Sequence, residues 1–148
     1  MLTFPSSTVM ELMGMAGFGF VHFDGEHGPF TPDIPDDFCR VAEAADITPI
    51  TRVPDIEPST TLRFLDWDIM GIMGPHITIS EAARQFADAC RYVPLGKRSF
   101  GSGRGAHFGK FSSTIEYMED FNSEVLVIAQ LRGPQCLETH LYDILNVY

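Results

Sequence analysis

Residues 17–29 read Gly-Phe-Gly-Phe-Val-His-Phe-Asp-Gly-Glu-His-Gly-Pro and indicate the fold class. Residues 18–23 are mostly apolar and aromatic, and they predict a strand buried on both faces, as parallel strands under helices usually are. Asp24, Glu26 and His27 follow at its carboxyl end, where Gly28-Pro29 stop the strand. Reactive side chains gather at such strand ends in parallel α/β folds. The same residues also suit an ordinary solvated loop between a strand and a helix.

Outward from this stretch, strand-like and helix-like segments alternate along the whole chain. Short apolar runs occupy residues 2–4, 48–53, 69–77 and 125–131, although Pro5 cuts the first short and Gly74-Pro75 interrupt the third. Between them, apolar residues recur at helical spacing. The clearest of these residues are Val9, Leu12, Met13, Ala16, Ile34, Phe38, Val41, Leu62, Leu65, Ala82, Phe86, Leu137, Leu141 and Ile144. This alternation predicts a parallel sheet with crossover helices.

The number of strands limits the architecture. We count about five strands, the first truncated, where a complete (β/α)₈ barrel has eight. No linker or change in composition divides the chain, so residues 1–148 are expected to form a single domain. The predicted fold class is α/β, a partial TIM (β/α)₈ barrel made of about the first five βα units.

Capping patterns predict where several helices begin. Thr8 with Glu11 and Thr78 with Glu81 both match the capping box, in which two side chains satisfy backbone N–H groups reciprocally. Ser112 or Ser113 is expected to cap a further short helix.

Composition excludes some classes of partner. The chain has 10 Lys and Arg against 20 Asp and Glu, a net charge of -10, which argues against nucleic acid or an anionic membrane as the main partner. Three widely spaced cysteines form no C-x-x-C pair and fit reduced thiols better than a disulfide framework. With no leader-like or bilayer-spanning run in the sequence, a cytoplasmic location is expected.

Four polar residues near predicted strand ends are the candidate site. His27, Arg52 and Gln130 lie at or near the ends of strands, and Asp66 ends the helix that precedes one. A histidine beside a carboxylate can act as a general base, because the acid favours the imidazolium. A nearby arginine can bind a carboxylate or a developing oxyanion. Surface ion pairs are the simpler interpretation of the same pattern.

Two other patterns have simple structural explanations. Residues 101–105 read Gly-Ser-Gly-Arg-Gly, but they lack the spacing and preceding strand of a dinucleotide fingerprint, so a flexible loop is expected. The surrounding residues 91–110 hold half of the basic residues and leave anion binding open. His22 alternates with Asp24 and Glu26, which suits either a metal cluster or the polar interior of a barrel.

Taken together, these motifs resemble the class II, metal-dependent pyruvate aldolases, which include 4-hydroxy-2-oxoheptanedioate and 2-dehydro-3-deoxyglucarate aldolases. The matching pieces keep their order over nearly the whole chain. They are Ala16-Gly17-Phe18, residues 24–29 (Asp-Gly-Glu-His-Gly-Pro), Thr51-Arg52-Val53, Phe64-Leu65-Asp66, Gly74-Pro75, residues 91–98 (Arg-Tyr-Val-Pro-Leu-Gly-Lys-Arg) and Gln130-Leu131.

The resemblance implies a carbon–carbon lyase that cleaves a 4-hydroxy-2-oxo or 2-keto-3-deoxy acid into pyruvate and an aldehyde. It implies that His27 is the general base, that Asp66 raises the basicity of His27, and that Arg52 stabilises the enolate oxygen. Gln130 would contact a small 2-oxo acid substrate. A divalent ion (Mg, Mn or Co) would chelate that substrate, which is the Lewis-acid chemistry that enolate formation needs.

The metal site is where the sequence departs from the family pattern. The family has a metal-binding Glu two residues after the glutamine, and Arg132 stands there in this chain. The second metal ligand of the family would follow Tyr148, so no residue of this chain is assigned as a ligand and metal binding is expected to be weak.

Three functional interpretations follow. The first is an aldolase-type lyase with an incomplete barrel and impaired activity. The second is a non-catalytic binding or assembly module with the same fold. The third is an anion-binding protein that uses residues 91–110. A homo-oligomer is expected, because an open sheet leaves strand edges that invite pairing with another chain.

Overall fold

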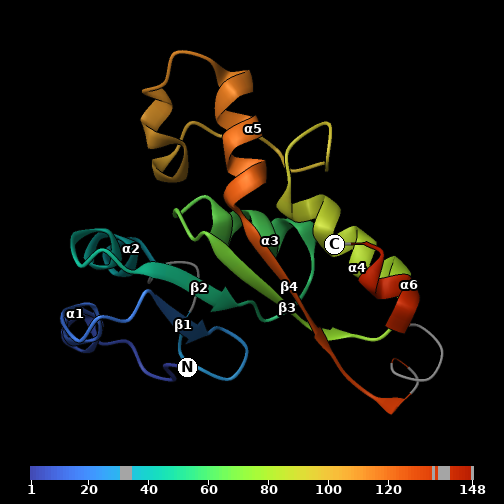
Figure 1. Ribbon diagram of the computed structural model, residues 1–148, viewed down its shortest axis with the longest axis horizontal. Coiled ribbons are helices and arrows are strands. Elements are labelled where there is room, and N and C mark those ends of the chain that lie inside the picture. Colours follow the sequence, from blue (N-terminus) through green and yellow to red (C-terminus); the bar gives the residue numbers. More distant parts are fainter. Residues whose placement is uncertain (31–34, 135, 137–140, 148) are drawn as a thin grey trace.

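Four parallel strands form one sheet, in the order in which they occur along the chain (Figure 1). They are β1 (Phe20–Asp24), β2 (Thr48–Arg52), β3 (Gly71–Ile77) and β4 (Leu126–Leu131). This computed structural model describes residues 1–30, 35–134, 136 and 141–147, and the predicted helical positions Ile34 and Leu137 lie outside them. Because consecutive parallel strands are neighbours, their carboxyl ends all meet at one edge of the sheet.

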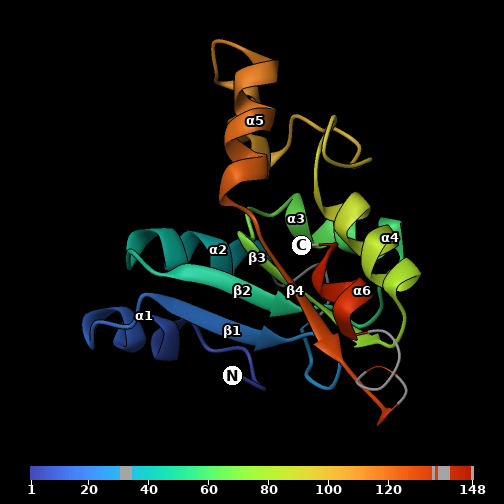
Figure 2. The same cartoon turned by 45° about the vertical axis from the view of Figure 1, so that its right-hand side comes forward.

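Helices connect the strands and supply an outer layer (Figure 2). They are α1 (Ser7–Met15), α2 (Pro35–Ala44), α3 (Pro58–Leu65), α4 (Ser80–Cys90), the 3₁₀ segment η1 (Arg104–Gly109), α5 (Thr114–Glu124) and α6 (Leu141–Leu145). In both views α5 and η1 stand together at the amino end of the sheet, beside the start of β4. No helix among the described residues combines the length and apolar character needed to cross a membrane.

The core lies between the helices and one face of the sheet, in two clusters. The smaller cluster packs Met10 of α1 and Phe38 of α2 against Val21 and Phe23 of β1. The larger cluster joins β3 and β4 to α3, α4, α5 and α6. Its fully buried members include Phe64, Leu65, Ile69, Ile72, Ile77, Phe86, Cys90 and Ile144. Burial of this apolar surface is the main force that holds the layers together.

The other face of the sheet, called here the uncovered face, lies away from the described helices and is exposed where β1 and β4 begin. Phe20 is 58% exposed and Leu126 is 50% exposed, and both alternate along their strands with residues of the helix-covered face. The prediction of a strand buried on both faces was therefore wrong for β1, because that expectation assumes a closed barrel. Phe18, 56% exposed, precedes the strand rather than belonging to it.

The truncated first strand is present as a single bridge. Leu2 pairs in parallel with Phe23, and its backbone N–H donates to the carbonyl of His22 at 2.7 Å. Within the described residues, the sheet thus has four full strands and one short stub, which matches the expectation of about five strands with the first truncated. Gly74-Pro75 do not interrupt β3 but coincide with a register shift toward β4.

The helix starts agree with the capping predictions only in part. Ser113 caps α5, with its Oγ accepting from the backbone N–H of Glu116 at 3.3 Å. Helix α1 is capped by Ser6 rather than by Thr8. Helix α4 begins after Ile79 without a side-chain cap, so the capping box predicted at Thr78 does not form.

Candidate functional site

The carboxyl edge of the sheet begins with a tight turn after β1. Asp24 is 2% exposed, and its Oδ1 accepts from the backbone N–H groups of Glu26 at 3.1 Å and His27 at 3.2 Å. Gly25 donates its N–H to the carbonyl of Arg52 at 2.8 Å, and a Cβ on Gly25 would lie 2.7 Å from that oxygen. A glycine is therefore required for the turn to approach β2 this closely.

Arg52, at the end of β2, binds Asp24 through two parallel hydrogen bonds. Its Nε donates to Asp24 Oδ1 at 3.0 Å, and its Nη2 donates to Oδ2 at 2.7 Å. Burial alone would raise the pKa of Asp24, but the hydrogen bonds from Arg52, with those from the backbone of His27 and Glu26, outweigh it and lower that pKa. The pair is therefore ionised at neutral pH and fixes the guanidinium at the sheet edge.

A second carboxylate extends the network across the sheet. Glu26 Oε2 lies 3.0 Å from Nη1 of Arg52 as an ion pair, and Glu26 Oε1 lies 2.5 Å from Nε2 of His76. His76 Nδ1 lies 2.9 Å from Nη1 of Arg132. Since arginine can only donate, Nδ1 accepts and the proton sits on Nε2, facing Glu26. A continuous chain of contacts thus joins β1, β2, β3 and the end of β4.

His27 stands beside this network and is open to solvent. Its side chain is 69% exposed, and its Nε2 lies 3.6 Å from Oε1 of Glu26. A general base needs access to its substrate, and this exposed position provides it. The structure therefore brings His27 and Arg52 to the same edge, with Asp24 and Glu26 between them.

Gln130 lies at the same end of the sheet, near the end of β4. Its neighbours Ala129 and Leu131 pack against the larger core cluster, so alternation places Gln130 on the uncovered face. That face also carries Arg52 of β2.

Asp66 lies at the opposite end of the sheet. It ends α3 and precedes β3, so it stands at the amino ends of the strands. Its Oδ1 accepts from Nη2 of Arg98 at 2.9 Å. The expectation that Asp66 raises the basicity of His27 is therefore not met within this chain, where Glu26 is the carboxylate beside His27.

The residues at the site do not fit a divalent metal. Across the part of the chain that the structure describes, no group of three His, Cys, Asp or Glu side chains is arranged to hold one. The carboxylates of Asp24 and Glu26 are already paired with Arg52, and Arg132 adds a positive charge at the same edge. The metal-cluster alternative for His22 is therefore not supported. Burial, the N-terminus and Arg52 lower the pKa of His22, although Asp24 alone would raise it.

Three cationic side chains within residues 91–110 pair with carboxylates of this chain. Lys97 pairs with Asp88 at 2.6 Å, Arg98 with Asp66, and Arg104 with Glu43 at 2.6 Å. The glycine-rich loop leads into η1. Carboxylates of this chain therefore largely neutralise the cationic groups of residues 91–110.

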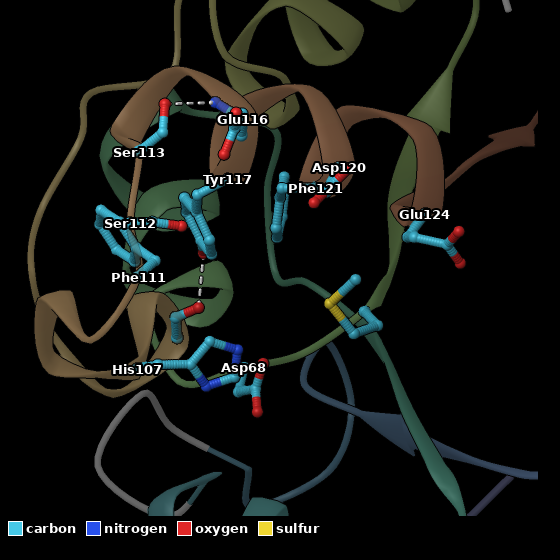
Figure 3. A pocket seen from close by; sticks show the side chains of 12 residues that line it. Asp68, His107, Phe111, Ser112, Ser113, Glu116, Tyr117, Asp120, Phe121 and Glu124 are labelled. Atoms are coloured by element: carbon cyan, nitrogen blue, oxygen red, sulfur yellow. Dashed lines mark hydrogen bonds between the residues drawn. The ribbon is translucent and has the colours of Figure 1, made fainter.

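A separate cavity of about 350 Å³ lies between α5, η1 and the residues that precede β3 (Figure 3). The aromatic rings of Phe111, Tyr117 and Phe121 line it, with Glu116 and Asp120 on the same helix. The Tyr117 hydroxyl donates to the carbonyl of Gly105 at 2.6 Å, which ties α5 to η1. None of the predicted site residues lines this cavity.

The sequence pattern did not single out His76. Its φ of +56° is unusual for a residue with a side chain and coincides with the register shift at the end of β3. The rule that strand ends carry reactive groups, applied to residues 69–77 as it was to residues 17–29, would have placed His76 in the site.

Residues 2–147 match the HpcH/HpaI aldolase/citrate lyase family. The chain belongs to this family.

Similar proteins agree with membership of the HpcH/HpaI family. The chain is 31% identical over 124 residues to a 4-hydroxy-2-oxovalerate aldolase of Novosphingobium aromaticivorans, covering 83% of this chain and 46% of that protein. It is 29% identical over 145 residues to a hydroxypyruvate/pyruvate aldolase of Roseobacter denitrificans, covering 97% and 54%. The crystal structure of an HpcH/HpaI aldolase from Desulfitobacterium hafniense superposes with a TM-score of 0.88 at 25% identity, covering 96% of this chain and 54% of that one. This HpcH/HpaI chain thus spans about half the length of the relatives it matches.

Proposed function

We propose that this chain carries the catalytic edge of a pyruvate-aldolase-type lyase, which cleaves a 4-hydroxy-2-oxo or 2-keto-3-deoxy acid into pyruvate and an aldehyde. The observation that carries the proposal is the pairing of Arg52 with buried Asp24 beside exposed His27. Family membership supports the same reaction class.

The side chains divide the work of such a cleavage. His27 takes the proton from the substrate's 4-hydroxyl as the C3–C4 bond breaks and the aldehyde forms. The electron pair passes to the pyruvate enolate, whose oxygen Arg52 stabilises. Two of the five N–H donors of Arg52 bond to Asp24, and Glu26 adds an ion pair, which leaves donors for that oxygen. Gln130 contacts the 2-oxo acid from the carboxyl end of β4.

Exchange of the methyl protons of pyruvate in deuterated buffer tests this assignment, because enolate formation needs only part of the machinery. We expect the unmodified protein to accelerate exchange, as followed by NMR, with and without added Mg²⁺. His27→Asn should lower the accelerated rate by about a hundredfold or more, because a general base typically contributes that much. His107→Asn, a matched change at the other end of the sheet, should leave the rate unchanged. Exchange at the rate of buffer alone would reject the lyase.

The second candidate is a binding or assembly module without catalysis. The uncovered sheet face, with exposed Phe20 and Leu126, favours it, because soluble proteins rarely leave such a surface without a partner. The two candidates differ in the exchange experiment, since a module would bind a partner without enolising pyruvate.

A further inference from the structure

Building on the proposed function, we propose that Arg132 binds the carboxylate of the 2-oxo acid in place of a divalent metal ion. The carboxylates at the carboxyl edge of the sheet are paired with Arg52, and Arg132 adds a positive charge, so these residues do not fit the metal that the family pattern implies.

The first step is the position of Arg132. It follows β4 directly, and its backbone N–H donates to the carbonyl of Ile77 at 3.2 Å, so it sits beside the end of β3. Gln130, the proposed substrate contact, lies two residues earlier on the same strand. The guanidinium of Arg132 therefore lies at the same edge of the sheet as that of Arg52. Contacts through His76 and Glu26 connect the two.

The second step is that the neutral imidazole of His76 orients Arg132. His76 presents a lone pair on Nδ1 to Arg132 while its Nε2–H faces Glu26. The ring of His76 thus lies between Glu26 and Arg132, at a residue with a φ of +56°. One N–H of the Arg132 guanidinium bonds to His76. Because Arg132 is exposed, its other N–H donors face solvent.

The third step is charge. Asp24 and Glu26 carry two negative charges, and Arg52 and Arg132 carry two positive charges, so these four side chains balance one another. At the position of the family's metal-binding Glu, Arg132 replaces a negative charge with a positive one, which disfavours a cation and favours an anion. A divalent ion added beside both arginines would be repelled without gaining a free carboxylate. A carboxylate, in contrast, can accept two parallel N–H donors from Arg132.

Titration calorimetry with pyruvate tests the proposal. The unmodified protein should bind pyruvate with the same affinity in EDTA and in Mg²⁺. Arg132→Met should weaken binding about tenfold or more, because a charge-assisted hydrogen bond is lost. Arg84→Met, which removes an exposed arginine on α4, is the matched control and should bind like the unmodified protein. Arg132→Glu should lose binding in EDTA and regain part of it when Mg²⁺ is added.

The outcomes separate this inference from the proposed function. Pyruvate binding that depends on added Mg²⁺ in the unmodified protein, or that Arg132→Met leaves unchanged, would overturn the role of Arg132 and leave the 2-oxo acid site intact. An unmodified protein that binds no pyruvate in either condition would overturn both. Circular dichroism of each variant shows that a loss of binding is not a loss of fold.

Discussion

At the scale of single residues, the buried Asp24–Arg52 pair governs both the site and its stability. Both side chains are nearly excluded from solvent, so each depends on the other for its charge. Removing one partner of a buried pair leaves an uncompensated charge, which costs far more than the pair contributes.

Asp24→Asn should therefore lower the free energy of unfolding by about 3 kcal/mol or more at pH 7. The lowered pKa of Asp24 means that the stabilisation is fully present above the unfolded-state pKa of about 4 and is lost as the pH falls through the folded-state pKa. The difference between the variant and the unmodified protein should thus be constant from pH 5 to 7 and shrink below about pH 4. Urea unfolding across this range measures it. Asp120→Asn, on exposed α5, is the control, and an equal loss in both variants would contradict the role of the pair.

At the scale of elements, the sequence predicted strands more reliably than it predicted their surroundings. Runs such as residues 125–131 are apolar enough to define a strand from local composition. The exposure of Phe20 could not be predicted from the residues around it in the sequence, because it depends on what packs against the uncovered face of the sheet. Asp66 was grouped with His27 because both flank strands, but a helix that leads into a parallel strand ends at that strand's amino end. The contact of Arg132 with His76 depends on a register shift and a positive φ, which sequence spacing does not encode.

The cap of α5 gives a prediction at this scale. Ser113→Ala should lower the free energy of unfolding by about 1 kcal/mol, because the backbone N–H of Glu116 loses its acceptor. Ser112→Ala, one residue earlier and outside the cap, should change it by less than about 0.5 kcal/mol. Urea unfolding of both variants compares them, and equal effects would show that the Ser113 hydroxyl does not cap the helix in solution.

At the scale of the whole molecule, the uncovered face and the outer strands of the sheet lead us to expect association with another chain. Phe20 and Leu126 expose apolar surface on the side of the sheet opposite the helices. β4 ends the sheet formed by the described strands, and Leu2 pairs only with the carboxyl half of β1; outer strands of this kind readily pair with another chain.

The protein should therefore sediment as a dimer or larger species. Phe20→Ser with Leu126→Ser should shift it toward the monomer, because apolar area no longer drives association. Phe108→Ser, an equally exposed position on η1, should not. Sedimentation velocity distinguishes these results, and a monodisperse, cooperatively unfolding monomer for the unmodified protein would exclude association through this face.

The three cysteines have a practical consequence that follows from their burial. Cys39 lies in α2, Cys90 in α4 and Cys136 after β4, and all three are buried. Burial raises the pKa of Cys90 to about 12, so its reactive thiolate is scarce in the folded state. A thiol reagent therefore labels each position only when the structure around it opens, and the relative labelling rates rank the local unfolding of different parts of one molecule.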